Sequence, residues 1–186
     1  MIAGLVLAGG RSSRYGSEKA VARLDGETLL ERALAVLRGD CAALAVSARP
    51  ESGAAALAAG LGLPVLPDAD GAPDGPLAGV AAGLRWAAGL GAEALVTLPC
   101  DMPHAPQALA RRLIAGRGDA FAAFATTAEG VHPLCALWSI DLLASLDSAL
   151  ADGHPAVQGF LADVGAAAVR FEDAAAFANM NRPGDL

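Results

Sequence analysis

Short apolar runs alternate with Ala- and Leu-rich helical segments along the whole chain, and this alternation is the feature that most constrains its fold. Residues 2–8 form a continuously apolar run, which is typical of a strand buried on both faces of a parallel sheet. Residues 28–38 (TLLERALAVLR) instead repeat their leucines at helical spacing. The pattern predicts an α/β fold, with a mostly parallel, Rossmann-like sheet and helices on both faces.

The remaining elements follow from the same two periodicities. Further strands are expected at residues 43–47, 64–66, 94–98, 120–125, 132–138 and 168–171. Further helices are expected at residues 52–59, 77–88, 106–115, 140–151 and 157–164. Neither an internal repeat nor a linker of domain length interrupts the series, so the 186 residues are expected to form a single domain.

Composition and charge narrow the possible functions. The chain is 54% hydrophobic, contains no apolar run of membrane-spanning length and begins without the basic segment of a signal peptide. Its net charge of −7 argues against an extended nucleic-acid surface. Cys41, Cys100 and Cys135 show neither CxxC pairing nor metal-ligand spacing with the histidines, as expected for reduced thiols. We therefore expect a cytoplasmic protein that binds neither nucleic acid nor membrane.

A glycine-rich loop, LAGGRSSRYGSEK, follows the first expected strand. Open α/β sheets bind their ligands at this end of the strands. Gly9 and Gly10 allow a phosphate to approach backbone N–H groups, and Arg14 and Lys19, the only lysine of the chain, add positive charge. The spacing matches neither a Walker A motif nor GxGxxG. The loop is interpreted as an anion-binding loop, and the alternative is a glycine-rich turn that only packs.

A single carboxylate, Asp101 in LPCDMP, follows the strand expected at residues 94–98 and should lie at the same sheet edge as the glycine-rich loop. Mg²⁺ prefers one or two carboxylates together with waters and phosphate oxygens, so Asp101 is a candidate metal ligand. In the alternative, Asp101 caps a turn or the helix near Pro106. No Ser/His/Asp arrangement can be assembled, and His132 is interpreted as a structural residue of its strand.

Two further motifs carry candidate substrate-binding groups, each with a structural alternative. Asn179 and Asn181, the only asparagines of the chain, alternate in FANMN as residues on one face of an extended segment do. Their alternative is a plain turn. In DGPLAG the proline suits a helix start, which would present the backbone N–H groups of Leu77, Ala78 and Gly79 to an anion. The alternative there is a simple loop-to-helix junction.

In this order, the motifs resemble the molybdenum cofactor guanylyltransferases (the MobA family) within the LAGG-type nucleotidyltransferases. The matching stretches are LAGGRSSRYGSEK, VLPD, GPLAG, LPCDMP, HPLCALW and NMNRPGDL, so the resemblance covers essentially the whole chain. Arg49 stands where the family often has the asparagine of SANR, which leaves the identity of the base open. The resemblance implies a nucleotide-diphospho-sugar-transferase-like domain over residues 1–186, with a nucleotide-binding part at about 1–101 and a pterin-substrate part at about 102–186.

The resemblance also implies a role for each matching residue. Leu7, Ala8 and Gly9 would line the guanine and ribose side of a pocket, and Arg14 and Lys19 would grip phosphates. The nucleotide-binding set would be Leu7, Ala8, Gly9, Gly10, Lys19, Asp68 and Asp101. The substrate-binding set would be Leu77, Ala78, Gly79, Asn179 and Asn181. The catalytic set would be Lys19, Arg14 and Asp101, with Asp101 also holding Mg²⁺.

The implied reaction transfers GMP from GTP to the terminal phosphate of molybdopterin and releases pyrophosphate. A phosphate monoester is already nucleophilic, so the protein must supply alignment and charge neutralisation rather than a nucleophile or a strong base. The implied enzyme is a monomer in transient contact with cofactor-insertion and molybdoenzyme-maturation proteins. Three alternatives stay open: a cytidylyltransferase acting on the same pterin, a LAGG-type nucleotidyltransferase acting on a sugar phosphate, and a non-catalytic nucleotide-binding or carrier protein.

Overall fold

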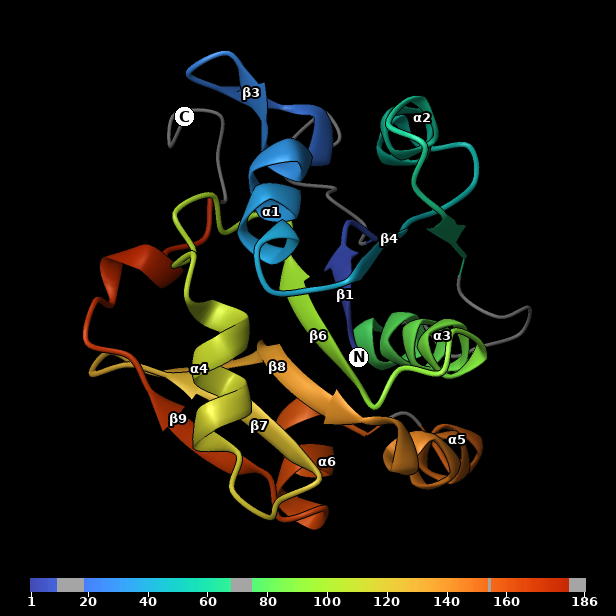
Figure 1. Cartoon of the computed structure of the whole chain (residues 1–186), viewed down its shortest axis with the longest axis vertical. Coiled ribbons are helices and arrows are strands. Elements are labelled where there is room, and N and C mark those ends of the chain that lie inside the picture. Colours follow the sequence, from blue (N-terminus) through green and yellow to red (C-terminus); the bar gives the residue numbers. More distant parts are fainter. Residues whose placement is uncertain (10–18, 68–74, 154, 181–186) are drawn as a thin grey trace.

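The computed structural model describes residues 1–9, 19–67, 75–153 and 155–180. Within them, seven strands form one sheet in the order β5-β4-β1-β6-β8-β7-β9 (Figure 1). The strands are β1 (Ile2–Leu7), β4 (Ala43–Ser47), β5 (Val65–Leu66), β6 (Ala94–Pro99), β7 (Ala122–Thr126), β8 (Val131–Ser139) and β9 (Ala167–Arg170). β5, β4, β1 and β6 run parallel to one another, and β9 runs parallel to β7. Only β8 reverses the direction, being antiparallel to both β6 and β7, so the predicted mostly parallel sheet is confirmed.

Helices cover both faces of the sheet, as predicted. The first face carries α1 (Leu29–Arg38), α2 (Gly53–Gly60) and α4 (Leu109–Gly116), and the second carries α3 (Pro76–Gly89), α5 (Leu143–Ala151) and α6 (Val157–Asp163). Side chains alternate between the two faces of β1, so the strand contributes to both hydrophobic cores. Val6 packs into the core on the first face, and Leu5 and Leu7 pack into the core on the second. In Figure 1, α4 crosses in front of β7 and β8 while α6 lies behind them. None of the described helices has the length and apolar character needed to cross a membrane.

Helix α3 lies close against the sheet because two of its inward positions are glycine. A Cβ atom at Gly83 would lie 2.5 Å from Cδ2 of Leu5 and 2.8 Å from Cδ2 of Leu95. A Cβ atom at Gly79 would lie 2.6 Å from Oγ of Ser47. Glycine lowers the helix propensity of this segment, but it permits the close approach. The first turn of α3 is thereby held beside the ends of β1 and β4.

The structure adds a β-hairpin that the sequence analysis did not predict. β2 (Arg23–Leu24) and β3 (Glu27–Thr28) pair around Asp25 and Gly26, whose φ angles are 52° and 89°. Asp-Gly is a favoured pair for such a tight turn, but strands of two residues show no periodicity from which to detect them. The hairpin ends at Thr28, whose hydroxyl accepts the N–H of Glu31 and begins α1. In return the Glu31 carboxylate accepts the Thr28 N–H, which lowers the pKa of Glu31.

The other boundaries agree with the prediction to within a few residues. The largest shifts are at α4, which begins at Leu109 rather than at residue 106, and at α5 (Leu143–Ala151), which was expected to begin at residue 140. Residues 106–108 instead form a turn, closed by the Leu109 N–H donating to the carbonyl of Pro106. The segment Ile140–Leu142 is a short 3₁₀ helix leading into α5. These shifts leave the sheet and its two helical layers as expected.

Candidate active site

The parallel strands β1, β4, β5 and β6 end at one edge of the sheet, and this edge gathers the segments that follow them. Backbone contacts continue past the strand ends: the Ala8 N–H donates to the Ser47 carbonyl at 2.9 Å, and the Cys100 N–H donates to the Leu7 carbonyl at 3.1 Å. Gly9, directly beyond, is exposed. The start of the LAGG loop and the LPCDMP turn are therefore neighbours, as the sequence predicted.

Lys19 and Asp101 meet at this edge. Lys19 opens a short 3₁₀ helix, η1 (Lys19–Val21), and its Nζ donates to Oδ2 of Asp101 at 3.4 Å. The two side chains are 19% and 23% exposed, so the pair is mostly buried but still in contact with solvent. Residues separated by 82 positions thus place one cation and one anion within reach of the same ligand. A triphosphate and a metal ion would need this combination of charges.

The structure does not favour the alternative in which Asp101 is only a cap. Ala108, not Asp101, is the N-cap residue of α4. Among the described residues, the hydrogen-bond donor to the Asp101 carboxylate is the Lys19 ammonium rather than a backbone N–H group. As far as the described residues go, the hydrogen bond uses Oδ2 and leaves Oδ1 of the carboxylate for a ligand.

The C-terminal segment also contacts the turn that carries Asp101. Beyond the short 3₁₀ helix η3 (Ala175–Phe177), the chain is extended, and the Met180 N–H donates to the carbonyl of Asp101 at 2.9 Å. Asn179, one residue earlier, is exposed. Asn179, which was singled out from the sequence, thus lies one residue from a backbone hydrogen bond to the candidate metal ligand.

The GPLAG motif forms the start of α3. Leu77, Ala78 and Gly79 are buried, and the Ala78 N–H donates to the carbonyl of Gly75 at 3.3 Å. Leu77 packs into the second core, so its side chain supports the site rather than facing it. Substrate binding by this motif stays a prediction. The predicted site residues Gly10, Arg14, Asp68 and Asn181 lie outside the described residues, and their roles likewise stay predictions.

The donor atoms of the LPCDMP turn suit a hard divalent cation. Asp101 supplies a partly exposed carboxylate, whereas Cys100 and Met102 on either side are buried. Within the described part of the chain, no group of three or more His, Cys, Asp or Glu side chains comes together. A dedicated protein cage for a metal is therefore not formed by these residues. A cation that keeps its waters and shares phosphate oxygens with one carboxylate fits them.

His132 makes a contact that its sequence pattern did not predict. Its ring stacks on Phe177, with centroids 4.6 Å apart, and its Nε2 lies 3.2 Å from the hydroxyl of Thr127. Burial lowers the pKa of His132, so the ring is neutral near pH 7. These contacts agree with the structural interpretation of His132. The only sequence signal for the partner was the phenylalanine that opens FANMN.

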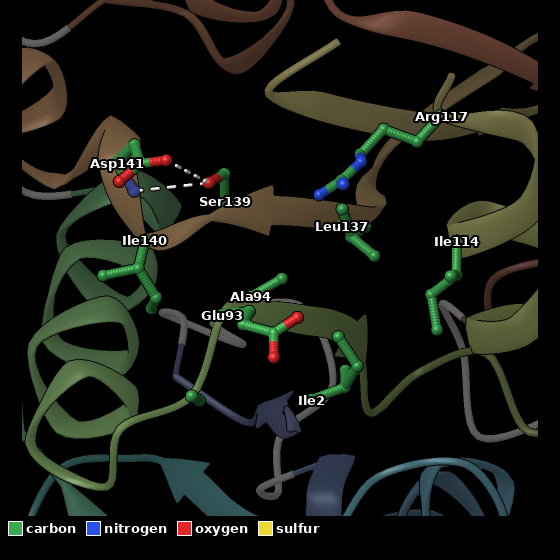
Figure 2. A pocket seen from close by; sticks show the side chains of 10 residues that line it. Ile2, Glu93, Ala94, Ile114, Arg117, Leu137, Ser139, Ile140 and Asp141 are labelled. Carbon is green, nitrogen blue, oxygen red and sulfur yellow. Dashed lines mark hydrogen bonds between the residues drawn. The ribbon is translucent and has the colours of Figure 1, made fainter. Parts of the chain in front are cut away.

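Two hollows in the described part of the chain are lined by other residues. One, of about 630 Å³, lies between the start of α2 and the end of β5, and Ser52 and Pro67 are among its lining residues. The other, of about 420 Å³, lies at the opposite edge of the sheet. Figure 2 shows Arg117 reaching over Leu137 in this second hollow, with Ser139 hydrogen-bonded to Asp141. No described residue of the predicted site lines either hollow.

Comparison with known proteins identifies the family. A family model described as the MobA-like NTP transferase domain matches residues 4–169. The chain belongs to this family. The molybdenum cofactor guanylyltransferase of Cereibacter sphaeroides is 47% identical to it over 98% of this chain and 92% of the relative.

Solved structures share the fold of this MobA-like chain. Molybdopterin-guanine dinucleotide biosynthesis protein A from Archaeoglobus fulgidus superposes with a TM-score of 0.75 at 23% identity, over 98% of this chain and 94% of that one. A Mycobacterium tuberculosis protein in complex with manganese superposes with a TM-score of 0.67 at 22% identity, over 92% and 89%. The MobA-like chain is thus a nucleotidyltransferase with the fold that its sequence predicted, in a family that generally uses a divalent metal.

Proposed function

We propose that this MobA-like nucleotidyltransferase transfers GMP from GTP to the terminal phosphate of molybdopterin, forming molybdopterin guanine dinucleotide and pyrophosphate. The observation that carries the proposal is the 3.4 Å contact between Lys19 Nζ and Asp101 Oδ2 at the carboxyl edge of the parallel strands. It pairs the two charges that nucleotidyl transfer needs, in a chain 47% identical to a protein named molybdenum cofactor guanylyltransferase.

The reaction asks for alignment and charge neutralisation. An oxygen of the molybdopterin phosphate forms a bond to the α-phosphorus of GTP, the bond from that phosphorus to the β-phosphate oxygen breaks, and pyrophosphate leaves with the electron pair. Because the ionised phosphate is itself the nucleophile, no side chain has to remove a proton from it. The Lys19 ammonium would neutralise charge on the triphosphate. Mg²⁺ held by Asp101 would neutralise phosphate charge when bound.

The two substrates would occupy two sides of the Asp101 turn. The nucleotide side, in residues 1–101, would be lined by Leu7, Ala8 and Gly9, with Gly10, Arg14 and Asp68 completing it. The pterin side, in residues 102–186, would include Asn179 and Asn181, and Leu77, Ala78 and Gly79 would support it from α3. The hydrogen bond from Met180 to Asp101 joins the two sides and supports this arrangement.

Four further statements belong to the same proposal. The metal is Mg²⁺, since a single carboxylate with phosphates and waters suits that ion. The protein acts as a monomer. It works in the cytoplasm, in keeping with three buried free thiols. It hands its product to cofactor-insertion and molybdoenzyme-maturation proteins through transient contacts.

The test is pyrophosphate release by the purified protein with Mg²⁺ and molybdopterin, using GTP and CTP in parallel. We expect release from GTP, dependent on molybdopterin, and little from CTP. Preference for CTP would make the protein a cytidylyltransferase on the same pterin. Turnover with a sugar phosphate in place of molybdopterin would point to another LAGG-type enzyme. GTP binding without any pyrophosphate release would indicate a carrier.

A further inference from the structure

Three rings gather where β7, β8 and β9 approach the C-terminal segment. His132 on β8 stacks on Phe177 at 4.6 Å with an interplanar angle of 23°, and Phe171 meets Phe177 edge-on at 5.1 Å. Phe171 and Phe177 are 2% and 3% exposed. Aromatic pairs in these geometries stabilise beyond the area that they bury. The three rings form a cluster, here called the ring clamp (His132, Phe171 and Phe177).

Polar contacts fix the ring clamp on both sides. The hydroxyl of Thr127, across the β7–β8 turn, lies 3.2 Å from Nε2 of His132 and sets the plane of its ring. The guanidinium of Arg112, on α4, lies 4.1 Å from the centroid of Phe171. The Asp173 carboxylate accepts the N–H groups of Ala175 and Ala176 and so holds the 3₁₀ turn that presents Phe177. Phe177 is therefore held by ring contacts on two sides and by the 3₁₀ turn that carries it.

The ring clamp is joined to the active site by a short stretch of backbone. Three residues after Phe177, the Met180 N–H donates to the carbonyl of Asp101 at 2.9 Å. Strand β8, which carries His132, also contacts the Asp101 turn, because Cys135 Sγ lies 3.2 Å from Met102 Sδ. Strand β8 thus contacts both the Asp101 turn and the segment that crosses it.

We propose that His132 is a positioning residue: by stacking on Phe177, its ring holds residues 178–180 across the Asp101 turn and fixes the distance between the Asn179 amide and the Asp101 carboxylate. This inference rests on the proposed function, in which the two groups serve the two substrates. A fixed distance between them sets how closely the attacking phosphate approaches the α-phosphorus. Small misplacements of reacting groups lower rates strongly. The imidazole itself takes no proton in the reaction.

The first test measures how firmly the ring clamp holds the C-terminal segment and needs no activity measurement. Hydrogen exchange at the Met180 amide is compared in the wild type, His132→Ala, His132→Leu and His132→Phe. Loss of the stacked ring is expected to lower the protection of this amide by about three- to tenfold in the Ala and Leu variants, whereas Phe retains a ring and most of the protection. The Leu variant fills the space if the Ala variant folds poorly. Unchanged Met180 protection in His132→Leu would overturn the proposal.

The second test is kinetic, with GTP, Mg²⁺ and molybdopterin. His132→Ala and His132→Leu are expected to raise the KM for molybdopterin and lower kcat about tenfold, with little change in the KM for GTP, and His132→Phe is expected to restore both. Phe121→Ala, which removes an exposed ring at the far end of β7, is the matched control and should behave as the wild type. Equal losses for both substrates, or none, would contradict a positioning role. If the wild type transfers no GMP, the proposed function fails. The hydrogen-exchange measurement then still tests whether the His132 ring holds residues 178–180 in place.

Discussion

At the scale of single residues, the candidate site brings together two opposite charges, those of Lys19 and Asp101. The Lys19–Asp101 pair is partly exposed, so it contributes about 1 kcal/mol or less to stability. Separating the two groups therefore costs little. In the proposed reaction, the ammonium would turn to phosphate and the carboxylate to the metal. The proposed role of the pair is therefore to bind charged ligands rather than to stabilise the fold.

We predict that Asp101→Asn abolishes most nucleotidyl transfer while the melting temperature changes little. The amide keeps the size of the side chain but loses the negative charge that Mg²⁺ favours. The backbone carbonyl that accepts the Met180 N–H is untouched, so the local fold should remain. A Mg²⁺ titration of pyrophosphate release, run beside melting curves, measures both effects. Residual activity should require more Mg²⁺ than the wild type; identical Mg²⁺ dependence would remove Asp101 as a metal ligand.

We predict that Lys19→Ala lowers turnover about tenfold or more with the fold intact, because a preorganised charge on the triphosphate is lost. The matched control is Arg85→Ala, which breaks the surface ion pair with Asp147 between α3 and α5. Both variants remove one positive charge, so a general effect of net charge would appear equally in both. Steady-state rates with GTP and molybdopterin decide the matter. Wild-type turnover in Lys19→Ala would exclude Lys19 from the chemistry.

At the scale of elements, the sequence predicted most of the fold because most of it obeys simple periodicity. β4 lies where the sequence predicted it, and α1 begins one residue after the expected start, with Thr28 as its cap. Features without periodicity were not found: the two-residue strands of the hairpin and the crossing of residues 178–180 over the Asp101 turn. The meeting of Lys19 and Asp101 was predictable, since parallel strands end at one edge. The partner of His132 was not, because it depends on how the C-terminal segment folds back.

Helix α3 shows an element shaped by its contact rather than by propensity. We predict that Gly83→Ala destabilises the protein by about 1–3 kcal/mol, because the new Cβ would lie 2.5 Å from Leu5 and force the core to shift. Gly89→Ala is the control: it lies in the same helix, with nothing within 4 Å of its Cβ position. There the gain in helix propensity should stabilise by up to about 1 kcal/mol. Urea unfolding should show opposite signs of the change in stability for the two variants; stabilisation of both would mean that helix propensity dominates at both positions.

At the scale of the whole molecule, the proposed nucleotide part (residues 1–101) and the proposed pterin part (residues 102–186) contribute strands to one sheet. The proposed boundary follows β6, yet β6 pairs with β1 on one side and with β8 on the other. Neither part can unfold without exposing an edge and both apolar faces of a central strand. The two proposed parts therefore form one folding unit, and a single cooperative unfolding transition is expected.

Thr97 offers the sharpest test of this cooperativity, because it links the two parts inside the core. Its hydroxyl donates to the Leu134 carbonyl at 2.7 Å and accepts the indole N–H of Trp138 at 3.0 Å, and both Thr97 and Trp138 are fully buried. Thr97→Val keeps the shape but leaves the buried indole N–H and the Leu134 carbonyl without that partner, at a cost of about 1–3 kcal/mol. Thr97→Ser keeps the hydroxyl and serves as the control. Because the sheet is continuous, the urea midpoint of unfolding in Thr97→Val should be lower than in the wild type. It should fall by the same amount whether it is followed by tryptophan fluorescence or by far-UV circular dichroism. Separate shifts of the two signals would show instead that residues 1–101 and 102–186 fold independently.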